Sequence, residues 1–523
     1  MSKYTPRSEN HKGVLFRKDG QLFIRTKFMR DAAELEIPME ELLEDFEGKG
    51  VEIDLYTRKT GDPIFKAKDW TSLPEEFPDP DYEYCSEAGY EKFLDQKFGL
   101  FMHWGQYSVL GLTESWTANA QNCPRYWWET YYTLYQSFNP TEFCADEWAE
   151  MAERAGMQFF ILTTKHHDGF CLFDTKTKTK ALRRIGHLHN TVVGPVEECY
   201  INYSMMDTPY KVDIIDEAVR AFRKKNMGIG LYFSHIDWND PNFRWDPANR
   251  SFDPDYTPEK NPDEWKAFIQ RERDQLVELF TNYGPLDQVF FDGTWFGLAW
   301  KEMKEIVKEL RKLQPDCMLS DRGTGPMADF TSPERWIPAD KDDNRIKQKR
   351  KHPLAWQVCD VIATHWSHVP DEKYKDKNDL LEMLISITAK GGTFALNVPP
   401  MANGKFPQQS IDILEYMGRW LKVNGEAIYA TRPIKGDFKQ GDNIYFTRSK
   451  DDKFIYAIHV GWPHEKVELA HVQAKTGSTI KMLGIDEALP WENAGGKLVI
   501  TIPPALNKQI PCEYAFSFKI EKA

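Results

Sequence analysis

Between residues 81 and 430, short apolar runs alternate with stretches of helical periodicity. The runs are rich in β-branched and aromatic residues, which indicates buried strands of a parallel sheet. They cover 98–105, 159–169, 229–235, 288–292, 317–322 and 393–397, and 358–365 adds a further candidate. The helical stretches cover 141–155, 213–225, 262–283 and 300–314. This alternation predicts an α/β fold with a (β/α)8-like TIM barrel, of which seven strand candidates are visible.

The pattern changes on both sides of this region. Residues 13–27 hold two alternating runs joined by Asp19-Gly20, a typical hairpin turn, and residues 51–56 alternate again. We therefore expect a small β-rich extension and linker over 1–80, followed by a catalytic barrel over 81–430. Beyond residue 430 the helical periodicity stops and short strands bounded by turn residues take over. This change predicts a C-terminal antiparallel β-sandwich over 431–523.

Composition narrows the class of protein. The net charge of −13 argues against nucleic-acid binding, and no apolar run is long enough to span a membrane. The polar amino end predicts a cytoplasmic protein, or a periplasmic or secreted one if a leader has been removed. The eight cysteines show no zinc-type spacing, so free thiols without a cofactor are expected, and a homo-oligomer is left open. The 17 tryptophans mildly favour a protein that acts on carbohydrate.

The most informative stretch is 287–295, where a short apolar run ends in Asp292, followed by Gly293 and then Trp295. In α/β barrels the residues after the carboxyl end of a strand face the ligand site. A carboxylate at this place could attack a ligand, and the flat apolar face of Trp295 suits a sugar ring. The alternative is that Asp292 only caps the helix that follows.

Histidines follow two other predicted strands. His103 precedes Trp104 at the end of one strand, and His166 and His167 end another. These side chains could donate hydrogen bonds to sugar hydroxyls. Two alternatives stay open. The three histidines and Asp168 could ligate a metal, although no HExxH helix supports this, or the histidines could be buried and bonded to loop carbonyls.

Hydrolysis of a glycoside requires two carboxyl groups, which lie about 5 Å apart in retaining enzymes. If Asp292 is one of them, its partner must lie on another loop. Asp321 could simply pair with its neighbour Arg322. Residue chemistry alone does not choose among the candidates, which are Glu114, Glu129, Asp168, Asp237, Asp321, Asp329 and Glu334.

Five segments together resemble glycoside hydrolase family 29, the α-L-fucosidases. They are KFGLFMHWGQYS (97–108), TTKHHDGF (163–170), GPLDQVFFDG (284–293), KGGTFALNVPP (390–400) and GRWLKVNGEAIY (418–429). Each segment alone is a weak signal, but the five occur in the family's order. The resemblance covers about residues 85 to 433.

This resemblance implies a retaining, exo-acting enzyme that removes terminal α-linked L-fucose from a glycan or oligosaccharide without a metal. Asp292 is then the nucleophile that forms a covalent glycosyl-enzyme. Glu334 is the implied acid/base, because 331–334 resembles the family's Thr-Pro-Glu segment with one residue inserted. The implied substrate-binding residues are His103, Trp104, His166, His167, Tyr232, Trp295, Arg322 and Trp366.

The sequence departs from the family pattern at two places. Gln357 stands where many relatives carry a glutamate that was also considered for the acid role, and a glutamine cannot protonate a leaving group. Residues 365–368 read His-Trp-Ser-His where the family usually has Ser-Trp-Gly-Tyr. The alternatives are therefore the same fold acting on a related, α-galactoside-like sugar, or a catalytically impaired glycan-binding protein.

Overall fold

The computed structural model divides the chain into two compact units, Met1–Glu75 and Glu76–Ala523. The residues that it describes are 14–18, 21–26, 35–38, 82–119, 125–185, 194–243, 245–246, 251–252, 258–293, 299–338, 353–470 and 472–523. In the first unit, β1 (Val14–Lys18), β2 (Gln21–Thr26) and β3 (Leu35–Pro38) form an antiparallel sheet. Lys18 pairs with Gln21, as the predicted hairpin requires. The strand expected at 51–56 lies outside the described residues.

The second unit is built on eight parallel strands. They are β4 (Phe98–Met102), β5 (Phe159–Lys165), β8 (Gly228–Ser234), β11 (Gln288–Asp292), β12 (Met318–Leu319), β13 (Phe330–Thr331), β14 (Ala355–Val361) and β15 (Thr393–Asn397). Each strand pairs with its neighbours in chain order, and a parallel bridge between Ser320 and Phe330 joins β12 to β13. The ring is therefore closed, which confirms the predicted (β/α)8-like barrel. The strand without a sequence prediction is β13, which is only two residues long.

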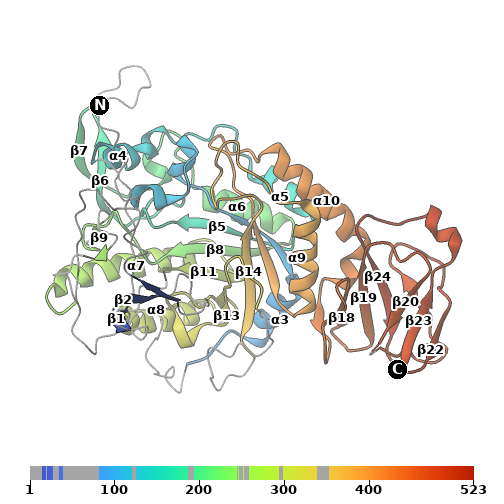
Figure 1. The fold of residues 1–523 in the computed structure, drawn as a ribbon. Helices are drawn as coiled ribbons and strands as arrows, with labels where there is room; N and C mark the ends of the chain where they lie inside the picture. The colour runs from blue at the N-terminus through green and yellow to red at the C-terminus, as the bar shows by residue number, and fades with distance from the viewer. Residues whose placement is uncertain are drawn as a thin grey trace, which may run out of the picture. The chain divides into compact units, whose positions relative to one another are not determined.

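Helices lie around the strands (Figure 1). They include α3 (Glu87–Gln96), α5 (Ala145–Arg154), α6 (Ile214–Lys224), α7 (Pro262–Asn282), α8 (Trp300–Leu313), α9 (Lys377–Ala389) and α10 (Gln408–Asn424). The four predicted helices are confirmed as α5 to α8. The α6 helix begins where expected because the Asp213 side chain accepts a hydrogen bond from the Asp216 backbone and caps the first turn. Phe93 of α3 packs with the inward-facing residues of the strands, so α3 adds to the barrel core.

A hairpin that the sequence analysis did not predict lies between β5 and α6. It consists of β6 (Thr179–Arg184) and β7 (Val196–Ile201), which pair in antiparallel fashion. Two further short segments, β9 (Trp245–Asp246) and β10 (Ser251–Phe252), pair after β8. No helix in the described part of the chain meets the length and hydropathy of a membrane span.

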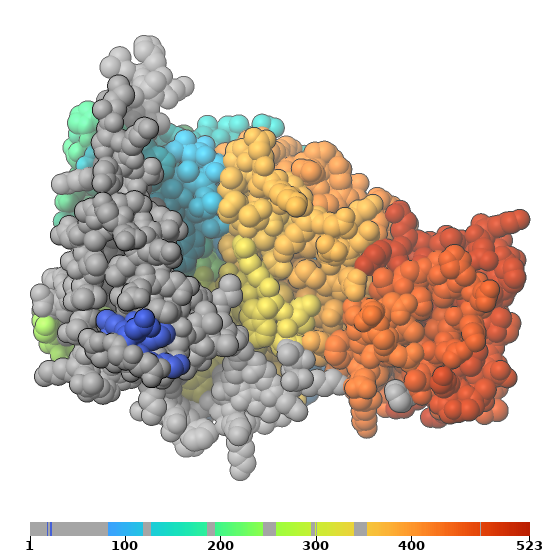
Figure 2. Space-filling model, viewed as in Figure 1, coloured from blue at the N-terminus to red at the C-terminus, as the bar shows by residue number. Residues whose placement is uncertain are grey.

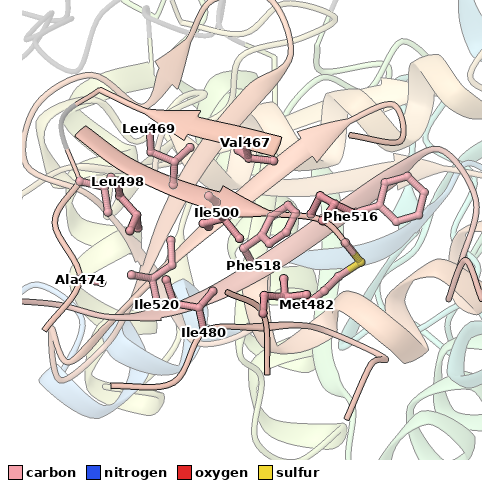
Figure 3. Packing of buried hydrophobic residues seen from close by; sticks show 14 of the residues in the cluster. Val467, Leu469, Ala474, Ile480, Met482, Leu498, Ile500, Phe516, Phe518 and Ile520 are labelled. Atoms are coloured by element: carbon pink, nitrogen blue, oxygen red, sulfur yellow. The ribbon is translucent and has the colours of Figure 1, made fainter. Parts of the chain in front are cut away.

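The C-terminal residues form two antiparallel sheets. One contains β16 (Thr431–Pro433), β17 (Lys439–Gln440), β18 (Ile444–Ser449), β19 (Phe454–Val460), β21 (Lys481–Met482) and β24 (Ala515–Glu521), and the other contains β20 (Lys466–Leu469), β22 (Trp491–Ala494) and β23 (Lys497–Thr501). Side chains from both sheets, such as Leu469, Ile500 and Phe518, meet in one buried apolar core (Figure 3). This arrangement confirms the predicted sandwich.

The sandwich packs on the barrel through α9 and α10. The indole of Trp420 in α10 donates a hydrogen bond to the carbonyl of Ala515 at 2.8 Å. Glu382 of α9 accepts hydrogen bonds from the hydroxyls of Tyr445 and Tyr514. In Figure 2 the orange and red atoms of the C-terminal residues gather in one lobe beside the barrel.

Candidate active site

Asp292 is the last residue of β11, and its position follows from the strand that carries it. The four preceding residues of β11 are buried, whereas 16% of the Asp292 side chain is exposed. Gly293 has a φ of 105°, a conformation that a residue with a Cβ rarely adopts, so the backbone turns directly after the carboxylate. The amide of Gly293 donates a hydrogen bond to Asp292 Oδ1 at 2.9 Å. The strand end therefore presents a fixed carboxylate at the mouth of the barrel.

Three neighbouring side chains set the charge of Asp292. Tyr232 donates its hydroxyl hydrogen to Oδ2 at 2.7 Å, Arg322 Nη1 donates to Oδ1 at 2.9 Å, and His167 Nε2 lies 3.7 Å from Oδ2. Burial by itself would raise the pKa of Asp292, but the Arg322 charge, His167 and the Tyr232 hydrogen bond outweigh it and hold the pKa well below its usual range. Asp292 is therefore ionised at neutral pH, as a nucleophilic carboxylate must be.

Arg322 joins Asp292 to a second carboxylate. Its Nη2 donates to Glu334 Oε2 at 3.0 Å, while its Nη1 is bonded to Asp292. Glu334 has a side-chain exposure of 43%, so it faces solvent at the rim. The backbone of this segment is fixed to β14 by a bridge between Glu334 and Cys359. One guanidinium thus binds two carboxyl groups, the number that glycoside hydrolysis requires.

The three histidines are buried beside Asp292, and each ring is anchored through Nδ1. His103 Nδ1 is bonded to Asn397 Oδ1 at 2.8 Å, His166 Nδ1 to Ser115 Oγ at 2.5 Å, and His167 Nδ1 to Ser234 Oγ at 2.6 Å. Burial lowers the pKa of His103 and of His167 to about 4, and that of His166 well below its usual value. All three rings are therefore neutral at pH 7.

The hydrogen bond at Nδ1 indicates which nitrogen of His103 carries the proton. Asn397 Oδ1 can only accept, so His103 donates from Nδ1. Nε2 of His103 then carries a lone pair at neutral pH and can accept a hydrogen bond from a ligand hydroxyl. The Ser234 hydroxyl lies within reach of both His167 Nδ1 and the carbonyl of Ile236 and has one hydrogen to donate, so its contacts fit either tautomer of His167.

Aromatic rings complete the cluster. The ring of Tyr232 lies 5.3 Å from that of His103 and 5.4 Å from that of His166, and Trp366 lies 5.0 Å from His103. We use the name Asp292 cluster for Asp292, His103, His166, His167, Tyr232, Arg322 and Trp366. Ionised, hydroxyl-bearing and aromatic groups that gather at the carboxyl end of a barrel are the side chains that bind a polyhydroxylated ring.

Comparison with known proteins agrees with the family resemblance seen in the sequence. The protein-family model described as Alpha-L-fucosidase matches residues 75–426, and the one described as Alpha-L-fucosidase C-terminal domain matches residues 438–521. The chain belongs to the α-L-fucosidase family. It is therefore a glycoside hydrolase that releases fucose.

The relatives match most of this fucosidase-family chain. The α-L-fucosidase of Branchiostoma floridae is 27% identical and covers 84% of this chain and 95% of its own length. The human plasma α-L-fucosidase is 26% identical over 84% of this chain and 92% of its own. The solved structure of α-L-fucosidase isoenzyme 1 from Paenibacillus thiaminolyticus has a TM-score of 0.67 and an identity of 26%, with 84% of this chain and 99% of that chain covered.

One of the residues that the family resemblance implied, Trp104, does not join the Asp292 cluster in the structure. Trp104 follows His103, and its ring is 1% exposed, packs against Phe138 and Trp148, and donates through Nε1 to the carbonyl of Met401. Neighbouring side chains near a strand end face opposite sides, which is the reason for this outcome. The prediction for Trp104 is thus corrected to a core residue. Trp295 lies outside the described residues.

The other candidate carboxylates belong to separate networks. Asp168 accepts hydrogen bonds from Gln106 and Tyr131, Asp237 pairs with Lys165 and Arg271, and Asp329 pairs with Arg311. Asp321 accepts from the hydroxyl and amide of Ser332 rather than pairing with Arg322. Glu129 lies on α4 (Arg125–Tyr131). Of the seven candidates, Glu334 contacts a member of the cluster, Arg322, and Glu114 is bonded to Ser367, the neighbour of Trp366.

Glu114 is the residue whose importance the sequence analysis understated. It is 5% exposed, and its Oε1 accepts from the amide of Ser367 at 2.8 Å, next to Trp366. Burial raises the pKa of Glu114 to about 7, although hydrogen bonds from the backbone at Ser367 and Trp366 oppose the rise. The run Thr113-Glu114-Ser115-Trp116 drew attention to this residue in the sequence. No local pattern, however, predicted that the run lies beside residues 366–367.

Three members of the cluster, His166, His167 and Asp292, could hold a metal, because their ligand atoms lie within 4.8 Å of one another. This set differs from the expected one, which included Asp168. The guanidinium of Arg322 already binds Asp292, and its positive charge opposes a cation at the same carboxylate. The geometry therefore suits a hydroxylated ligand better than a metal ion.

Proposed function

We propose that the protein is a retaining, exo-acting α-L-fucosidase that hydrolyses terminal α-linked L-fucose from glycans through a covalent glycosyl-enzyme on Asp292. The observation that carries this proposal is the shared guanidinium of Arg322, which binds both Asp292 and Glu334. Two carboxyl groups bound to one guanidinium support a retaining mechanism, which needs a nucleophile and an acid/base in the same site.

In the first step, a carboxylate oxygen of Asp292 attacks the anomeric carbon and the bond from that carbon to the glycosidic oxygen breaks. Glu334 gives its proton to this oxygen, so the rest of the glycan leaves as an alcohol. In the second step, Glu334 takes a proton from water, whose oxygen attacks the same carbon and releases Asp292. Two inversions give net retention.

The remaining members of the cluster bind the sugar. His103 and His167 form hydrogen bonds with sugar hydroxyls through Nε2, and Tyr232 and Arg322 hold the nucleophile in position between attacks. Trp366 offers an apolar face to the ring. His103, His167 and Tyr232 are at most 4% exposed, and such an enclosed site suits a terminal sugar rather than the middle of a chain.

The first test is release of the aryl alcohol from an aryl α-L-fucoside by the wild type and by Asp292→Asn, with an aryl α-galactoside as the control substrate. We expect turnover of the fucoside by the wild type and a loss of at least about a thousandfold in the variant, because no covalent intermediate can form. Asp292→Gly should regain part of the activity with azide and give a β-configured azide adduct.

Each other outcome has a meaning. A folded wild type that turns over only the galactoside would indicate a related sugar and would direct attention to residues 365–368. A wild type that binds L-fucose but turns over neither substrate would indicate a glycan-binding protein. Equal rates for the wild type and Asp292→Asn would contradict the assignment of the nucleophile.

A further inference from the structure

A buried pair of titratable side chains lies behind the Asp292 cluster and takes no part in the chemistry described so far. His235 directly follows β8, and Glu272 lies on α7. Both side chains have an exposure of 0%, and His235 Nδ1 lies 2.6 Å from Glu272 Oε1. Apolar side chains would fill this space at a lower cost in desolvation, so the pair points to a role other than packing.

His235 contacts the backbone of two members of the cluster. Its amide donates a hydrogen bond to the carbonyl of Asp292 at 3.0 Å, which continues the pairing of β8 with β11. Its ring atom Nε2 lies 3.2 Å from the carbonyl oxygen of Arg322. One residue therefore joins the main chain at the proposed nucleophile to the main chain of the arginine that binds it.

The carbonyl of Arg322 determines where the hydrogens of the His235 ring lie. A carbonyl oxygen can only accept, so Nε2 must donate to it. The contact with Glu272 then has two possible forms. Either the charged ring donates from Nδ1 to an ionised carboxylate, or a protonated Glu272 donates to Nδ1 of a neutral ring. In both forms the pair has no net charge and Nε2 keeps its hydrogen, so Glu272 maintains the donor that Arg322 requires.

The loop that carries Arg322 lies directly against the His235 ring. Gly323 has a φ of 79°, and a Cβ at this position would lie 2.5 Å from both Cδ2 and Nε2 of the ring. The same ring stacks on Phe291 of β11, with centroids 4.9 Å apart and an interplanar angle of 16°. The ring therefore sets the distance between β11 and the loop that follows β12 (Met318–Leu319).

The position of this loop matters because the guanidinium of Arg322 has to reach two carboxyl groups at once. Its Nη1 lies 2.9 Å from Asp292 Oδ1, and its Nη2 lies 3.0 Å from Glu334 Oε2. Ser332 accepts from Nε and Nη2 and holds the end of the side chain, but Ser332 belongs to the same segment as Glu334. The contact with His235 instead ties the backbone of Arg322 to the barrel strands.

We infer that His235, held by Glu272, is a positioning residue that fixes the backbone of Arg322 and thereby the alignment of Asp292 with Glu334. A displacement of about 1 Å in such a site costs on the order of a hundredfold in rate. The catalytic consequence rests on the proposed function, whereas the anchoring of Arg322 does not.

Two variants separate the contacts of the ring. A glutamine amide can take the place of Nε2 and an asparagine amide that of Nδ1, so His235→Gln keeps a donor for Arg322 and His235→Asn keeps a partner for Glu272. Each loses one buried hydrogen bond, so both should have a lower unfolding temperature than the wild type.

On the aryl α-L-fucoside, we expect kcat of His235→Gln within about fivefold of the wild type and that of His235→Asn lower by about 10–100-fold. KM should stay within about threefold for both, because Arg322 acts on groups that react in the transition state. A purely structural role would lower kcat equally in the two variants when both are folded, and this result would overturn the inference.

Gly323→Ala approaches the same contact from the loop, which keeps the inference testable if a variant of His235 does not fold. Its Cβ would push the loop away from the ring, so kcat should fall by at least about tenfold with little change in KM. An unchanged kcat in folded Gly323→Ala would contradict the inference. The matched controls are His459→Gln and His459→Asn in β19 of the sandwich, which should leave kcat unchanged.

Crystal structures of the wild type and of the two His235 variants give a readout besides activity. The distance from Arg322 Nη1 to Asp292 Oδ1 should lengthen beyond hydrogen-bond range, about 3.5 Å, in His235→Asn but not in His235→Gln. If the wild type turns over no fucoside while Arg322 shifts in this way, the proposed function fails and the anchoring stands. If the wild type turns over the fucoside while Arg322 keeps its place in both variants, the inference fails alone.

Discussion

At the scale of single residues, Arg322 organises the chemistry of this fucosidase-family protein. It fixes Asp292 through one terminal nitrogen and Glu334 through the other, and its Nε also donates to the hydroxyl of Ser332. The side chains of Arg322 and Asp292 are mostly enclosed, with exposures of 14% and 16%, which makes their interaction stronger than at an open surface. The proposed nucleophile therefore depends on a residue whose own role is electrostatic.

The role of Glu334 as the acid can be tested with substrates whose leaving groups differ in acidity. Glu334→Ala should lower kcat/KM for a fucosyl disaccharide by about 10²–10⁴-fold, because a sugar alcohol leaves only after protonation. An aryl fucoside with a strongly acidic phenol needs no proton and should lose less than about tenfold. Glu309→Ala, which removes a carboxylate on α8, serves as the control. Equal losses on both substrates would refute Glu334 as the acid.

Glu114 predicts a dependence of stability on pH. Its pKa is raised from an ordinary value of 4.5 to about 7 in the folded protein. The stability it contributes is therefore fully present below pH 4.5 and is lost as the pH rises through 7. The loss is at most about 3 kcal/mol, at about 1.4 kcal/mol per pH unit.

The measurement is the unfolding temperature of the wild type and of Glu114→Gln at pH 5 and pH 8. The unfolding temperature of the variant, relative to that of the wild type, should be higher at pH 8 than at pH 5, since glutamine does not ionise. Comparison at each pH is necessary because the depressed pKa values of His103 and His167 act in the opposite direction, with stability lost as the pH falls toward 4. An unchanged difference between the two proteins would show that Glu114 is not buried as described.

At the scale of elements, helix packing depends on places where only glycine fits. A Cβ at Gly418 of α10 would lie 1.9 Å from the carbonyl oxygen of Arg154, at the end of α5. Backbone on both sides cannot move apart without shifting the two helices. The contact between α5 and α10 therefore depends on the absence of a side chain at this position.

Gly418→Ala tests this contact. Alanine favours an isolated helix by about 1 kcal/mol, but overpacking against backbone costs about 1–3 kcal/mol and should outweigh it here. We expect a lower unfolding temperature than that of the wild type. Arg419→Ala, one residue later and exposed, should leave the temperature unchanged or raise it. An unfolding temperature for Gly418→Ala at or above that of the wild type would mean that the helices separate easily.

At the scale of the whole molecule, the sandwich and the barrel share polar contacts that are partly buried. Glu382 of α9 accepts at Oε1 from Tyr445 at 2.7 Å and at Oε2 from Tyr514 at 2.5 Å. Arg432 and Lys450 of the sandwich region pair with Glu91 of α3. None of these residues belongs to the Asp292 cluster, so the contact supports the fold rather than the chemistry.

Glu382→Ala should weaken this contact, because two tyrosine hydroxyls lose their acceptor, at about 1–3 kcal/mol for each. The expected result is a lower unfolding temperature with an unchanged kcat on the aryl fucoside. Glu382→Gln, which keeps one acceptor oxygen, should fall between the wild type and Glu382→Ala. A large fall in kcat at a temperature where the variant is folded would show that the sandwich influences the active site.

The features that could be predicted from the sequence alone are those with a local period of hydrophobic positions. Apolar runs predicted seven of the eight barrel strands and four helices, and the end of β11 identified Asp292, because strand and helix periods are carried by neighbouring residues. The strand β13 was not predicted, because a strand of two residues shows no hydrophobic periodicity. The hydrogen bonds of the histidines and the core position of Trp104 depended on side chains far away in the chain.

Only the tertiary structure decided how the site is assembled. It joined Asp292 to Glu334 through Arg322, brought Glu114 to the amide of Ser367, and bonded Nδ1 of His103 and of His167 to Asn397 and Ser234. Charges and hydrogen bonds act through space over a few ångströms, and the distance between two side chains is set by the closed ring of strands rather than by their separation in the sequence.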